Sequence, residues 1–170
     1  MVRRPPGIRS VLAPLAVMLG MVPAVFVAAV PAVANDFADG LAAYDGGDYR
    51  AAARHWKKAA AAGNVDAMTS LAGLYMAAQG VALNVETAAR WYRMAAERGD
   101  VAAQVNLGDL LSEGSGLPHD RIQAFMWLGL AARQGNAWAE ERHRALAAGM
   151  TAAELSEARS RLNAWRAKSD

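Results

Sequence analysis

The chain has 170 residues, 54% of them hydrophobic, and its lack of cysteine excludes disulfides, thiolate metal sites and cysteine nucleophiles. Its 41 alanines favour close-packed helices over sheets, so we expect an all-α protein. Only Arg3, Arg4 and Arg9 are charged before residue 35, and the 15 basic and 16 acidic residues beyond them form a nearly neutral body, which argues against a nucleic-acid partner.

Residues 1–34 have the pattern of a secretory signal peptide. A basic start precedes an uncharged apolar run from Val11 to Val33, and Ala32 and Ala34 supply the small side chains that signal peptidase needs. We expect cleavage after Ala34, which makes the mature protein periplasmic or secreted. The alternative is an uncleaved membrane anchor, because the run is longer than the roughly 20 residues that span a bilayer. Three prolines interrupt the run and favour cleavage.

Residues 35–64 predict a helical hairpin with a tight turn. The pair Gly46-Gly47 separates an apolar segment containing Tyr44 from a second one containing Trp56. The hairpin is similar to a tetratricopeptide unit. His55 takes the place that Trp91 takes 36 residues later, so we interpret it as a structural residue.

Beyond this hairpin the sequence repeats with a period of 36 residues, which defines units 65–100 and 101–136. Each unit predicts two helices, because apolar residues recur three and four positions apart on both sides of a glycine-containing loop. A polar residue precedes each helix as a cap, and a glycine ends each unit. The matched positions are Gly63, Gly99 and Gly135; Asn64, Asp100 and Asn136; Ala67, Ala103 and Ala139; Leu71 and Leu107; Leu74 and Leu110; Asn84 and Asp120; Ala88 and Ala124; and Trp91 and Trp127.

Residues 137–170 predict an incomplete unit and a capping helix. The first helix of a third unit is present, but the second helix of the pattern is not. Thr151 and Glu154 then form a capping box for a final helix from about Ala152 to Ala167. We expect this helix to close the last apolar face, as solenoid ends require.

Several short motifs recur inside the two complete units. They are Leu71-Ala72-Gly73-Leu74-Tyr75, Gly80-Val81, Asn84, Ala88, Trp91-Tyr92, Ala95-Ala96 and Gly99. Together they resemble the Sel-one-like repeat, a relative of the tetratricopeptide repeat. The second unit departs at Leu111 and Leu128, where the family usually shows Tyr. The resemblance implies a short α-solenoid of antiparallel helix pairs that serves as an adaptor in protein complexes.

The residues offer no constellation for catalysis. A serine β-lactamase needs Ser-x-x-Lys, yet no lysine of the chain follows a serine at that spacing. The three histidines, His55, His119 and His143, lie outside any H-E-x-x-H frame. We therefore expect no enzymatic activity, no metal and no cofactor.

The first helix of each unit carries residues that the core does not need, and in a solenoid these line the concave face. With one exposed tryptophan, the predicted partner-binding residues are Thr69, Met76, Val105, Asp109, Ser112 and Trp138. Our leading hypothesis is a non-catalytic interaction module of the bacterial cell envelope, an adaptor or regulator that binds an envelope protein or peptide on this face. The alternative is a cell-wall glycan-binding protein or an envelope hydrolase acting on β-lactams or peptidoglycan. The exposed end of so short a stack also allows a homodimer.

Overall fold

The computed structural model describes residues 32–165, and their side chains from residue 35 on. The predicted signal peptide lies outside these residues, apart from its last three positions. The described residues form eight helices and no strands, which confirms the all-α class. They are α1 (Ala32–Asp45), α2 (Tyr49–Ala61), α3 (Val65–Ala77), α4 (Val85–Glu97), α5 (Val101–Glu113), α6 (Arg121–Arg133), α7 (Ala137–Ala148) and α8 (Ala152–Ala164). Within residues 32–165 no helix is long and apolar enough to cross a membrane.

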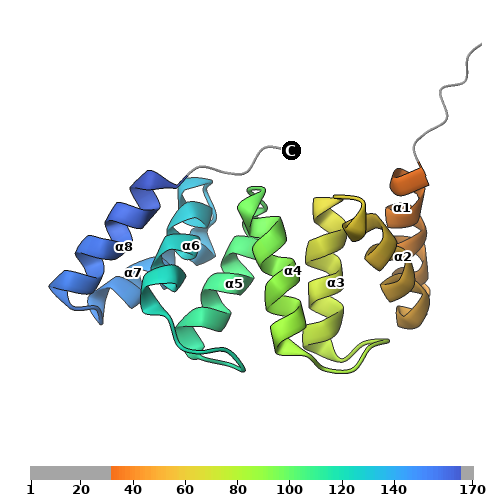
Figure 1. Cartoon of the computed structure of the whole chain (residues 1–170), viewed down its shortest axis with the longest axis horizontal. Helices are drawn as coiled ribbons and strands as arrows, with labels where there is room; N and C mark the ends of the chain where they lie inside the picture. The colour runs from red at the N-terminus through yellow and green to blue at the C-terminus, as the bar shows by residue number, and fades with distance from the viewer. Residues whose placement is uncertain (1–31, 166–170) are drawn as a thin grey trace, which may run out of the picture.

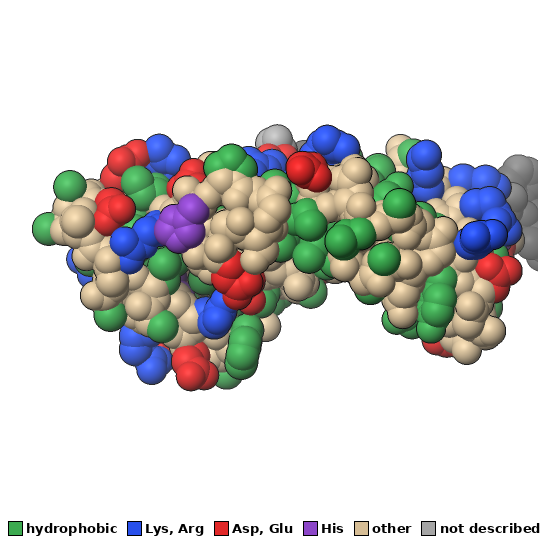
Figure 2. All heavy atoms as spheres, turned by 90° about the horizontal axis from the view of Figure 1, so that it is seen from below, with side chains coloured by type: hydrophobic (Ala, Val, Ile, Leu, Met, Phe, Trp, Pro, Cys, Tyr) green, Lys and Arg blue, Asp and Glu red, His purple; other side chains and the backbone are tan. Residues whose placement is uncertain are grey.

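The helices follow one another along the molecule, so the chain forms a short solenoid (Figure 1). Helices α1 and α2, α3 and α4, and α5 and α6 form three hairpins, and the second helix of each packs against the first helix that follows. Helix α8 packs against α6. Figure 2 shows an arched outline that is hollowed along its lower edge between two lobes.

Side-chain caps fix where the helices begin. Asn64, Asn84 and Asp120 each accept a hydrogen bond from the backbone N–H three residues on, as the sequence predicts. Thr151 and Glu154 form the expected capping box at the start of α8. That helix ends at Ala164, earlier than predicted, because the backbone becomes extended at Trp165.

Alanines make the closest contacts between the helices. At three positions of the repeat, every unit has an alanine with no exposed surface. These rows are Ala52, Ala88 and Ala124; Ala59, Ala95 and Ala131; and Ala67, Ala103 and Ala139. A methyl group lets two backbones approach closely, and the larger side chains of the second helices fill the remaining space. One position of the repeat has a large buried side chain in each second helix: Trp56, Tyr92 and Leu128.

The last helix closes the end of the stack. Leu162 is buried against the core, and Leu155 is partly buried beside it. The Trp165 ring lies edge-on to Trp127, with 4.8 Å between the ring centroids. These contacts confirm the predicted C-terminal capping helix.

The alanine rows predict strong sensitivity to larger side chains. Ala95→Leu should lower the free energy of unfolding by about 1–3 kcal/mol, because the added carbons must force two packed helices apart. Ala102→Leu, at an exposed position of α5, is the matched control and should change it by less than about 0.5 kcal/mol. Urea denaturation followed by circular dichroism measures both, and equal effects would show that the helices are not closely packed at Ala95.

The loops that follow α3 and α5 predict opposite effects of two substitutions on stability. Each begins with a residue in the left-handed conformation, Ala78 with φ of 55° and Gly114 with φ of 67°. Alanine is strained there and glycine is not. Ala78→Gly should raise the unfolding free energy by about 0.5 kcal/mol, and Gly114→Ala should lower it by about 1 kcal/mol. Thermal unfolding of both variants tests this, and a loss of stability in Ala78→Gly would contradict it.

Candidate functional site

Three hollows recur along the first helices of the hairpins, and we call them the hollow row. They lie between α1 and α3, between α3 and α5, and between α5 and α7, with volumes of about 400, 260 and 300 Å³. Their lining residues recur with the 36-residue period: Ser70, Asn106 and Arg142; Gly73, Asp109 and Ala145; Leu74, Leu110 and Leu146; and Trp56, Tyr92 and Leu128. The solenoid therefore builds one kind of hollow three times with different side chains.

The first hollow is apolar and aromatic. Leu41 and Tyr44 from α1 line it and are 46% and 38% exposed. The Tyr44 ring lies 5.5 Å from that of Trp56, which forms the inner wall. At Gly73 there is no side chain, and a Cβ atom there would reach nothing nearer than the Tyr92 hydroxyl at 4.0 Å. Exposed aromatic and aliphatic side chains around an open hollow are typical of protein-binding surfaces.

The second hollow is acidic. Asp109 and Glu113 line it together with Met76 and Asn106. Tyr92 takes the place of Trp56 here, and burial raises the pKa of its hydroxyl, so the group stays protonated at neutral pH. The same position along the repeat is therefore apolar and aromatic in the first hollow and carries carboxylates in the second.

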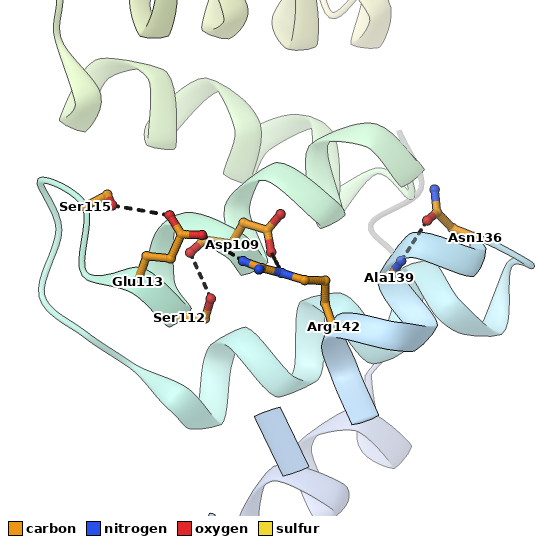
Figure 3. Close-up of polar contacts among 7 residues, drawn as sticks. All are labelled: Asp109, Ser112, Glu113, Ser115, Asn136, Ala139 and Arg142. Carbon is orange, nitrogen blue, oxygen red and sulfur yellow. Dashed lines mark hydrogen bonds and ion pairs between the residues drawn. The ribbon is translucent and has the colours of Figure 1, made fainter. Parts of the chain in front are cut away.

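Arg142 binds both carboxylates from the third hollow (Figure 3). Its Nε lies 2.8 Å from Asp109 Oδ1, and its Nη2 lies 2.7 Å from Glu113 Oε1. The hydrogen bond to Glu113, and to a smaller extent the one to Asp109, raises the pKa of Arg142. The guanidinium is therefore charged at neutral pH. Its Cζ also lies 5.9 Å from the ring centroid of Trp138. Arg142 therefore connects α7 to α5.

The structure distributes the six predicted partner-binding residues over different places. Met76, Asp109 and Ser112 line the hollow row. Thr69 donates a hydrogen bond to the Asp100 cap at 2.9 Å, and Val105 packs against the core. These two residues hold neighbouring units together.

Trp138 is 57% exposed beside Arg142, outside the lining of the hollows.

Sequence reasoning missed Leu41, Tyr44 and Arg142. The 36-residue period already aligned Arg142 with Asn106, but the sequence does not show that its side chain reaches the preceding unit.

The histidines lie in packing and ion-pair environments. His55 Nδ1 lies 3.1 Å from Asp36 Oδ1, and Asp39 completes a cluster whose ligand atoms are within 4.8 Å of one another. The Lys58 ammonium lies 3.9 Å from the same Asp36 oxygen, so a cation already offsets part of the negative charge of this cluster.

His143 packs on Phe125 with ring centroids 3.9 Å apart. Burial lowers its pKa, with further contributions from Arg133 and Arg159, so the ring is neutral at pH 7. His119 is exposed, and its neighbour Asp120 caps α6.

Comparison with known proteins identifies the repeats. Residues 39–64, 65–100 and 101–136 each match the family model of the Sel1 repeat. No curated protein sequence matches the chain.

Two solved structures are similar to the chain. One is a protective antigen of uropathogenic Escherichia coli strains that displays an SLR fold, at 28% identity and a TM-score of 0.71 over 76% of this chain. The other is a Sel1 repeat protein from Oxalobacter formigenes, at 34% identity and a TM-score of 0.60 over 63% of this chain. The chain spans only 29% and 44% of the lengths of these two proteins.

The Arg142 contacts predict a measurable stabilisation between units. Arg142→Gln should lower the unfolding free energy by about 1 kcal/mol, because it leaves two neighbouring carboxylates without their cation. Arg144→Gln removes an exposed pair with Glu140 within α7 and should cost about 0.3 kcal/mol. Urea denaturation at low and high salt compares the two, and an Arg142 effect no larger than that of Arg144 would contradict the inter-unit role.

Proposed function

Because the chain belongs to the Sel1 repeat family, whose repeats generally serve as protein-interaction modules, we propose that it is an adaptor or regulator of the bacterial cell envelope. Its hollow row binds a protein or peptide partner. The observation that carries this proposal is the recurrence of the hollows at a 36-residue period with side chains that differ in each unit. The recurring geometry gives each hairpin an open space of the same kind, and the differing side chains give each space its own chemistry.

The side chains of the hollow row suggest what the partner presents. The first hollow offers Tyr44, Leu41 and the open space over Gly73, which suit an apolar or aromatic side chain. The second offers Asp109 and Glu113, which attract basic groups although Arg142 already neutralises part of their charge. The partner segment therefore carries an apolar anchor and, one hollow away from it, a basic residue.

Two observations support a location in the envelope. The pattern of residues 1–34 is that of a secretory signal, which directs the mature chain across the inner membrane. One similar structure is that of a protective antigen present in uropathogenic Escherichia coli strains.

The alternative of a glycan-binding protein or an envelope hydrolase rests on the predicted envelope location and on exposed aromatic side chains, and Trp138 is the most exposed of these within the described residues. This side chain is exposed as the alternative requires, but it lies against Arg142 and outside the three hollows. Neither the family match nor the similar structures point to glycan or β-lactam chemistry. The Sel1 fold is typically a non-enzymatic scaffold.

Filling the first hollow and adding a charge in the second should abolish partner binding. The variant Gly73→Gln with Met76→Arg occupies the open space and adds a charge without replacing a fully buried side chain. We expect cross-linked pull-downs from the native envelope, with the full chain as bait, to lose the partner that the wild type enriches. Re-measured with the purified partner, the affinity should fall at least about tenfold.

The matched control is Glu86→Arg, an exposed substitution on the second helix α4, which should leave binding unchanged. Circular dichroism checks that all variants keep their helix content. Equal capture by the wild type and the filled variant would reject the hollow row as the binding surface.

A further inference from the structure

A separate hollow lies between α2 and the loop that follows α3. Its volume is about 300 Å³. Arg50, Arg54 and Lys57 line it from α2, and Leu71, Tyr75 and Val81 line it from α3 and the loop. We call it the basic hollow, because its charged lining residues all carry positive charge. None of these six residues lines the hollow row.

The three cations are placed for an external ligand. They occupy positions i, i+4 and i+7 of one helix, which puts them on one face over a length of about 10 Å. All three are exposed, and within residues 32–165 none makes an ion pair or a hydrogen bond. The neighbouring Lys58, by contrast, is paired with Asp36. Figure 2 shows Lys and Arg side chains gathered at the end of the molecule that holds α2.

The next repeat provides an internal comparison. The equivalents of Arg50, Arg54 and Lys57 are Glu86, Arg90 and Arg93. One cation is thus replaced by an acid, and the other two are engaged: Arg90 Nη2 donates to Thr87 Oγ1 at 2.8 Å, and Arg93 Nη1 donates to Gln123 Oε1 at 3.3 Å. Unpaired cations at these positions are a property of the first hairpin and not of the repeat.

The loop that forms the opposite wall is held directly on α2. Gly80 has φ of 68°, and a Cβ atom on it would lie 2.3 Å from the carbonyl carbon of Tyr49. Only glycine permits this approach, which fixes Val81 against the hollow. The basic hollow is therefore bounded by backbone that has little freedom to move.

We propose that the basic hollow binds an acidic peptide segment that carries an apolar side chain. Three unpaired cations favour an anionic partner such as a peptide with carboxylates, and the partly exposed Tyr75 and Val81 offer contact to an apolar side chain. An extended peptide places alternate side chains about 6.8 Å apart, close to the rise of about 6 Å between Arg50 and Arg54. An anionic membrane surface is flat, whereas this site is hollowed between α2 and the loop, so its shape favours a peptide. This site is independent of the hollow row.

The test uses a defined probe and the full chain in a non-ionic detergent. The probe is a fluorescein-labelled Glu-Glu-Leu-Glu-Glu peptide, compared with an analogue that has Gln for every Glu and another that has Gly for Leu. Fluorescence anisotropy measures binding to the wild type and to the variant Arg50→Gln, Arg54→Gln, Lys57→Gln. The control variant, Arg90→Gln with Arg93→Gln, removes cations at the equivalent positions of the next unit.

We expect the acidic probe to bind at least about tenfold more tightly than the Gln analogue, and the triple variant to lose about tenfold in affinity. The control variant should stay within about twofold of the wild type, and the Gly analogue should bind more weakly than the Leu probe. Equal binding of acidic and Gln probes, or equal losses in both variants, would overturn the proposal.

Vesicles containing phosphatidylglycerol, added after the detergent has been removed, provide the competing arm. If they displace the probe and their own binding falls in the triple variant but not in the control, the cations serve a membrane surface and the peptide proposal is wrong. The variant Gly73→Gln with Met76→Arg should bind the acidic probe normally. Failure of the hollow row is therefore distinguishable from failure of the basic hollow.

Discussion

The structure depends on the close approach of helices at rows of alanine. Because a methyl group is all that separates the backbones at Ala59, Ala95 and Ala131, successive hairpins adopt the same geometry. That uniformity explains why the hollows recur at one spacing. The second helix of each hairpin supplies one large lining residue to a hollow, which is Trp56, Tyr92 or Leu128. The first helices supply the charged lining residues.

The framework could be predicted from the sequence because its signals are local. Caps such as Asn84 and Asp120 act within one turn, and the period of 36 residues requires no knowledge of distant contacts. The predicted binding residues were less informative, because their roles depend on which side chains meet across units. Asp109 shows this: its position on α5 followed from the period, but its contact with Arg142 depends on a long side chain from another helix.

The two halves of the molecule use their polar groups differently. In the C-terminal half two arginines make contacts between helices: Arg142 joins α7 to α5, and Arg133 donates to the Leu162 carbonyl at 3.2 Å and so connects α6 to α8. In the N-terminal hairpin, cations and aromatic side chains remain exposed on opposite sides of α2. The first half of the solenoid therefore holds the unpaired cations, and the second half holds arginine contacts between helices.

The capping helix α8 also limits how copies of the chain can associate. It covers the apolar face of α6 with Leu162 and Trp165, where a further repeat would otherwise continue the array. Head-to-tail stacking joins one end of a repeat array to the other, so closing one end is enough to prevent growth into a filament. Any self-association must then use a surface other than this covered end of the stack.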